Sequence, residues 1–151
     1  MSRYPLFRQQ DLSLRPIAER GHDLTVSEVL PLTSRDSAVM PSEIRLIANR
    51  IRAARRADRP VILMMGAHPI KLGLSRFLID LLERRWGTLV ALNGAGIIHD
   101  FELSLVGGTS ENVAKWIAVG QFGLWRETSR LNDIIRGVFF PQAMEQIGGI
   151  K

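Results

Sequence analysis

Hydrophobic and polar positions along this chain form one pattern twice. Two short apolar runs, Val61–Met65 and Thr88–Leu92, each lead into a glycine-bearing turn, GAHPIKLG and NGAGIIHD. Apolar residues at helical spacing follow the first turn, and a shorter helical segment, Phe101–Val106, follows the second. An uninterrupted apolar run with no alternation is typical of a parallel strand that is buried on both faces. The pattern therefore predicts strand, turn and helix, repeated once.

A helix is expected before the first run. Pro41 and Glu43 suit the first turn of a helix, and apolar residues then recur at helical spacing to about Asp58, where Pro60 ends the segment. The apolar positions of this helix are Ile44, Ile47, Ala48, Ile51 and Ala54.

After the second run, the expected order is a break, a helix and a tail. Gly107 and Gly108 break the short helix, and Thr109-Ser110-Glu111 reads as the start of another, with a hydroxyl cap and an early acid. Leu124–Arg136 is predicted to be a last helix, and the segment from Gly137 onwards has only weak patterning.

The predicted fold class is α/β, a Rossmann-like parallel sheet with flanking helices. The expected divisions are an irregular N-terminal arm at 1–40, the Rossmann-like domain at 41–137 and a divergent C-terminal tail at 138–151. Two parallel strands are too few for an independent fold. Either Leu24–Leu30 and Val138–Phe140 add strands, or another chain completes the sheet, which favours a homo-oligomer, or the chain is part of a longer protein.

Composition narrows the classes of function. The 151 residues include no cysteine, which excludes disulfides, thiolate catalysis and cysteine-ligated zinc and fits a cytoplasmic protein. No apolar run reaches the ~20 residues of a membrane span. The net charge is +5, nearly all of the positive charge is arginine, and the densest run of arginines decorates the outer face of the predicted helix at 41–58. Without interleaved aromatic residues or a recognised module, this charge favours a solvated face over a nucleic-acid site.

The two turns carry most of the candidate chemistry. In open α/β sheets, ligands bind beyond the carboxyl ends of the strands, where these turns should meet. Gly66 allows close approach of a ligand to the backbone, and Lys71 offers a cation to a phosphate, although a plain solvated turn explains both equally well.

The second turn is the stronger candidate. Asn93, Gly94, Ala95 and Gly96 place three small residues and one amide at a strand end, where a ribose or nicotinamide could lie against the backbone. Asp100 is a candidate acceptor for ribose hydroxyls, or else a residue in the first turn of its helix that the helix dipole stabilises. Its neighbour His99 is more simply a structural histidine, since one His-Asp pair is too few ligands for a metal.

These segments resemble a known family. GAHPIKLGLSRFLIDLL, NGAGIIHDFELSLVGGTSENV and GQFGLWRET stand in order between Gly66 and Thr128, and they are similar to deoxyhypusine synthase-like proteins, a bacterial branch related to deoxyhypusine and homospermidine synthases. The resemblance implies a domain that binds NAD and takes part in aminobutyl transfer from a polyamine through a lysine imine. It also implies an oligomeric transferase.

Site residues carry over by position. Ala67 and His68 would lie at the first NAD-contacting loop, Ala95 and Gly96 at the small-residue turn, and Asp100 in place of an acid that contacts ribose or amine. His68 and Lys71 stand where the family has small polar residues. The catalytic lysine of the family lies further along than the resemblance extends, so the chain looks like the amino-terminal half with a divergent end. The alternative is a non-catalytic assembly or interaction domain, or an inactive truncated fragment.

Overall fold

The fold is a mixed α/β arrangement in a computed structural model that describes residues 3–5, 8–33 and 40–148, with backbone only for Gln9 and for 138–148. The chain divides into two compact units, Leu24–Ser110 and a second unit made of Met1–Asp23 with Glu111–Lys151. The predicted domain limits at residues 41 and 137 stay predictions. The boundaries of the two compact units instead lie between Asp23 and Leu24 and between Ser110 and Glu111. Each unit is considered by itself.

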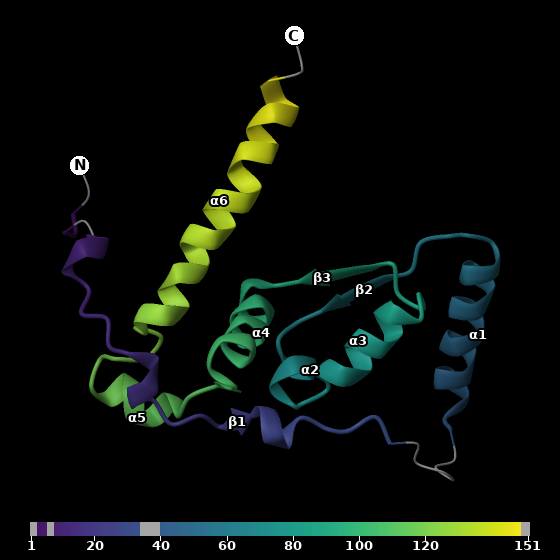
Figure 1. Ribbon diagram of the computed structural model, residues 1–151, viewed down its shortest axis with the longest axis horizontal. Coiled ribbons are helices and arrows are strands. Elements are labelled where there is room, and N and C mark those ends of the chain that lie inside the picture. The colour runs from purple at the N-terminus through teal and green to yellow at the C-terminus, as the bar shows by residue number, and fades with distance from the viewer. Residues whose placement is uncertain (1–2, 6–7, 34–39, 149–151) are drawn as a thin grey trace. The chain divides into compact units, whose positions relative to one another are not determined.

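Leu24–Ser110, the strand unit, carries the two predicted strands. β2 (Ile62–Met65) and β3 (Leu89–Leu92) pair in parallel, with Ile62 opposite Leu89 and Met65 opposite Leu92. The connection holds α2 (His68–Lys71) and α3 (Ser75–Glu83), and α4 (Gly94–Val106) follows β3. Figure 1 shows both strands running toward the end where α2 and α4 begin. The strand-turn-helix repeat is therefore confirmed.

The helix before the strands is also confirmed. α1 (Ser42–Arg56) begins after Pro41, and Asp58 ends the segment in a left-handed conformation with φ of 51°. Its apolar face is covered only in part, because Ala48, Ile51 and Ala54 are half-buried while Ile44 and Ile47 are exposed.

The burial predicted for the first strand is wrong. Exposure alternates along β2, and Ile62 and Met64 are 54% and 79% exposed while Leu63 and Met65 are half-buried. Leu89, which pairs with Ile62, is 54% exposed on the same face. The continuous apolar run indicated two covered faces, but within the described residues only one face of this sheet has substantial cover.

Neither expected extra strand joins the parallel pair. β1 (Leu24–Thr25) pairs antiparallel with β4 (Gly108–Thr109) in a separate sheet, and a 3-10 turn, η3 (Val26–Glu28), follows β1. Val138–Phe140 lies in a helix. The parallel sheet described has two strands, so the α/β class is observed while the larger Rossmann-like sheet stays a prediction.

The second unit is helical. It contains η1 (Gln9–Asp11), η2 (Ile17–Glu19), α5 (Val113–Ala118) and α6 (Arg126–Gly148). Thr109-Ser110-Glu111 does not start α5, because Thr109 belongs to β4 and Asn112 caps the helix by accepting from the Lys115 amide at 2.9 Å. α6 continues to Gly148, where a tail of weak pattern was expected.

The core of this unit centres on tryptophan. Trp116 and Trp125 meet edge to face with ring centroids 5.0 Å apart, and Ile17 packs with them. Trp116 and Trp125 therefore anchor the core of this unit. Among the described helices, none combines the length and apolar character required to cross a bilayer.

Candidate functional site

The two glycine-bearing turns adjoin in the strand unit. A Cβ built on Gly66, after β2, would lie 3.6 Å from the Asn93 side-chain nitrogen, after β3. α2 and α4, which start from these turns, pack against each other. The prediction that the two turns meet beyond the carboxyl ends of the strands is confirmed.

Asn93 organises the second turn. It caps α4, and its side-chain oxygen accepts from the Gly96 amide at 3.0 Å. The capped amide is satisfied, whereas the amides of Gly94 and Ala95 precede the first intrahelical hydrogen bonds of α4. These two N–H groups and the positive end of the helix dipole can therefore meet an anionic group.

The glycines of this turn have different roles. A Cβ on Gly94 would meet no atom within 4 Å, so the backbone there is open to a ligand. A Cβ on Gly96 would lie 3.1 Å from Leu92 Cδ2, so Gly96 lets α4 pack closely against β3. Gly94, Ala95 and Gly96 form the first turn of α4, not an open loop as the sequence pattern indicated.

Asp100 lies further along α4 than expected. It is exposed and follows Gly94 by six residues, which corresponds to about 9 Å along the helix axis. The alternative that placed Asp100 in the first turn of its helix is therefore wrong, since α4 begins at Gly94. Asp100 therefore lies away from the Asn93 cap and from the open Gly94 and Ala95 amides. Its spacing of seven residues from Asn93 nevertheless places it on the same side of the helix.

The first turn contains a helix that the pattern did not indicate. His68 and Lys71 are exposed at the two ends of α2, while Ala67 caps it and is half-buried. Ile70 is buried at 3% exposure and anchors this short helix. His68 and Lys71 are thus accessible to a ligand at the strand ends.

A buried polar cluster in the same unit was missed by sequence reasoning. The Thr109 hydroxyl donates to Glu102 Oε2 at 2.7 Å, and Thr109 Oγ1 lies 2.8 Å from His99 Nδ1. The hydroxyl proton goes to Glu102, so the Thr109 oxygen accepts from the His99 ring. His99 is half-buried and satisfied, which confirms its structural role. His99 and Glu102 are three residues apart, a signal that a helix starting at Gly94 would have revealed.

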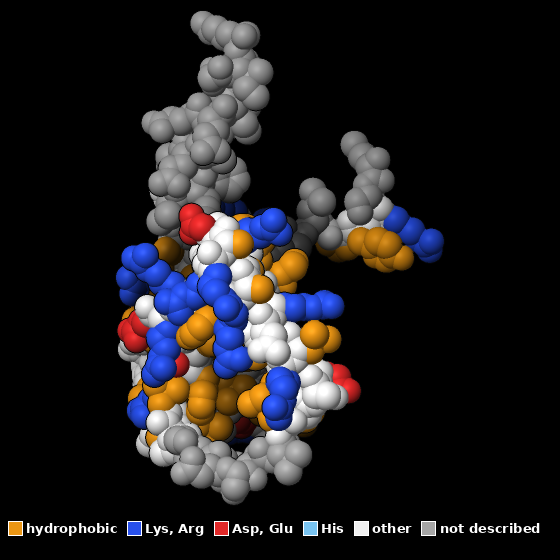
Figure 2. Space-filling view, turned by 90° about the vertical axis from the view of Figure 1, so that its right-hand side faces the viewer, with side chains coloured by type: hydrophobic (Ala, Val, Ile, Leu, Met, Phe, Trp, Pro, Cys, Tyr) orange, Lys and Arg blue, Asp and Glu red, His pale blue; other side chains and the backbone are white. Residues whose placement is uncertain are grey.

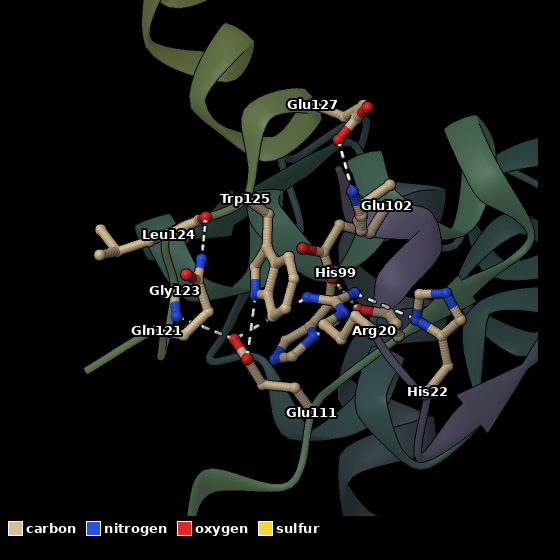
Figure 3. Close-up of polar contacts among 12 residues, drawn as sticks. Arg20, His22, His99, Glu102, Glu111, Gln121, Gly123, Leu124, Trp125 and Glu127 are labelled. Atoms are coloured by element: carbon tan, nitrogen blue, oxygen red, sulfur yellow. Dashed lines mark hydrogen bonds and ion pairs between the residues drawn. The ribbon is translucent and has the colours of Figure 1, made fainter. Parts of the chain in front are cut away.

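A second polar cluster lies in the helical unit. The buried Glu111 carboxylate accepts from Trp125 Nε1 at 2.9 Å and from the Gly123 amide at 3.1 Å (Figure 3). The buried Arg20 lies 3.9 Å from Glu111, with its guanidinium 5.6 Å from the Trp125 ring centroid. The two Glu111 carboxylate oxygens accept from Trp125 and from the nearby Gly123 amide, so these contacts support the tryptophan core.

Comparisons of the chain with protein-family models, with curated proteins and with solved structures found no match. The described residues also contain no group of three or more His, Cys, Asp or Glu side chains placed to hold a metal ion. The candidate site is therefore defined by the geometry of the two turns.

Proposed function

We propose that the strand unit binds a dinucleotide, NAD, at the adjoining turns, as part of a deoxyhypusine synthase-like protein of Rossmann-like ancestry. One observation carries the proposal: Gly66 and Asn93 meet at the carboxyl ends of two parallel strands, which is where open α/β sheets bind nucleotides. The resemblance of the same turns to that family supplies the cofactor and the substrate class, a polyamine that donates an aminobutyl unit.

Each residue of the two turns has a binding role that its chemistry suggests. The Gly94 and Ala95 amides at the start of α4 would hold the pyrophosphate, with Lys71 adding a positive charge. Ala67 and His68 would border the dinucleotide, Gly96 would let α4 lie close to β3, and Asp100 would accept hydrogen bonds from a ribose or an amine. The hydride chemistry belongs to the nicotinamide, and the lysine imine of the family has no counterpart among these residues.

Calorimetric titration of the whole chain with NAD tests the proposal. Gly94→Leu is the sharpest variant, because its side chain enters open space and obstructs the approach of a ligand to the backbone. We expect NAD binding to weaken by at least about tenfold, on the order of 1.4 kcal/mol. Gly137→Leu is the matched control, since a Cβ on Gly137 in α6 also meets nothing within 4 Å. A folded protein that shows no heat with millimolar NAD would contradict the proposal.

A second candidate function is assembly without catalysis. The face of the parallel sheet that carries Ile62, Met64 and Leu89 is exposed, and a two-stranded sheet is marginal alone. The occupant that this reading favours is a second copy of the chain, as in a homo-oligomer. Light scattering over a concentration series, combined with NAD titration, distinguishes the candidates, because NAD binding in any oligomeric state supports the first and self-association without NAD binding supports the second.

A further inference from the structure

An apolar cavity beside α1 in the strand unit has no role in the proposed function. Its volume is about 560 Å³, within the range of small-molecule sites. α1, the start of β2 and the end of α3 border this half-open hollow, and its apolar lining includes Ile47, Ile51, Leu63, Leu81, Leu82 and Trp86. The cavity adjoins the amino-terminal half of β2, away from the strand end that follows Met65. It is therefore separate from the proposed NAD site.

The mouth of this cavity is cationic. Arg52 and Trp86 line both the apolar cavity and an adjoining hollow of about 400 Å³, whose other lining residues are Arg55 and Arg56. Figure 2 shows basic side chains gathered around hydrophobic ones on the face that carries α1. Sequence reasoning assigned these arginines to a solvated helix face, but Arg52 borders an apolar cavity.

The three arginines keep their positive charge available. Arg52 donates to Asn49 Oδ1 at 3.1 Å, Arg56 Nε donates to the Arg52 carbonyl at 3.4 Å, and Arg55 lies 4.3 Å from the Trp86 ring centroid. These partners are all uncharged. Within the part of the chain that the structure describes, no carboxylate forms an ion pair with any of the three.

An apolar cavity with cations at its mouth suits an amphipathic anion. Transfer of an alkyl chain from water to an apolar lining stabilises the complex through the hydrophobic effect. The planar guanidinium of Arg52 matches a carboxylate and can bind it with two hydrogen bonds. We propose that this cavity binds a fatty acid, with its alkyl chain among Ile51, Leu82 and Trp86 and its carboxylate at Arg52.

The probe is sodium dodecanoate, used with the full chain below its micelle concentration. Calorimetry should show saturable binding to one site, and the intrinsic tryptophan fluorescence, to which Trp86 contributes, should change with the same midpoint. Arg52→Gln should weaken binding by about tenfold, as loss of a charge-assisted pair predicts. Arg50→Gln is the matched control, because Arg50 is on the same helix but lines neither hollow, and its affinity should equal that of the wild type. Ala48→Phe should fill the cavity and abolish binding.

Circular dichroism first shows that each variant is folded. The proposal is overturned if the folded wild type does not bind dodecanoate, if dodecyltrimethylammonium binds equally well, or if Arg52→Gln and Arg50→Gln lose affinity alike. Binding to anionic phospholipid vesicles without binding to free dodecanoate would also overturn it, as would binding only to an acidic amphipathic peptide. If free dodecanoate displaces the protein from vesicles, the same cavity binds the acyl chain, and a membrane lipid supplies that chain. Gly94→Leu should leave dodecanoate affinity unchanged, so this result is independent of NAD.

Discussion

Single residues at the second turn separate packing from ligand binding. Gly94 and Gly96 are two positions apart in one helical turn, yet only Gly96 faces a neighbour, Leu92 of β3. Sequence reasoning grouped them as one small-residue turn, because composition alone does not show which glycine meets a strand. The two glycines should therefore respond differently to the same substitution.

Alanine at the two glycines provides that comparison. Gly94→Ala should leave stability equal or slightly raised, because alanine is the better helix residue by up to about 1 kcal/mol. Gly96→Ala should lower the free energy of unfolding by about 1 kcal/mol, because its Cβ forces Leu92 to move. Urea denaturation followed by circular dichroism measures both. Equal midpoints for the two variants would show that Leu92 moves freely.

Asp100 gives a second prediction at this scale. Because Asp100 is exposed within α4 and not in its first turn, Asp100→Asn should change stability by no more than about 0.5 kcal/mol. If Asp100 contacts the ligand, NAD affinity should fall about tenfold, on the order of 1.4 kcal/mol. Calorimetric titration of the variant measures this, with thermal melting as its companion. An unchanged affinity would remove Asp100 from the site and leave the α4 amides as its centre.

At the scale of elements, the sequence predicted those that local periodicity and punctuation specify. α1, β2, α3 and β3 lie within a few residues of their expected positions. The start of α4 was placed seven residues too late, because Gly94 and Gly96 read as a turn while the Asn93 cap makes them helical. The predicted burial of β2 on both faces was wrong. An apolar run shows that burial would be favourable, but tertiary neighbours decide whether it occurs.

The turn after β1 gives a prediction at this scale. The Glu28 carboxylate accepts from the Thr25 amide and the Thr25 hydroxyl, both at 2.8 Å, and these hydrogen bonds, the amide first, hold the pKa of Glu28 below its ordinary 4.5. A lowered pKa means that the stabilisation is present above the ordinary pKa and is lost as pH falls through the lowered value. The Thr25 amide resonance should therefore titrate below pH 4.5, and NMR measures this.

Glu28→Gln is the control for this titration. It keeps the shape of the side chain and removes the ionisable group, so the low-pH step in the Thr25 amide resonance should disappear. A Glu28 titration at or above pH 4.5 in the wild type would contradict the hydrogen bonds at Thr25.

For the molecule as a whole, the two units differ in how they bury apolar side chains. The helical unit closes around Ile17, Trp116 and Trp125, a packed core fixed by the hydrogen bonds of Glu111. The strand unit instead leaves large apolar side chains exposed on its parallel sheet. Exposed apolar patches of this kind mark interaction surfaces in soluble proteins. The sequence did not predict what covers this face of the sheet, because local pattern does not specify the tertiary neighbours of a strand.

Met64 offers the most direct test of that surface. It is 79% exposed on the sheet face shared with Ile62 and Leu89, so Met64→Lys places a charge at the centre of the patch. We expect self-association of the wild type in sedimentation velocity and an association at least about tenfold weaker in the variant, because an unpaired charge opposes burial. Val119→Lys is the matched control, since Val119 is 67% exposed in the helical unit and its substitution should leave association unchanged. If the wild type stays monomeric throughout, or if both variants weaken association equally, the sheet face is not the interface between copies of the chain.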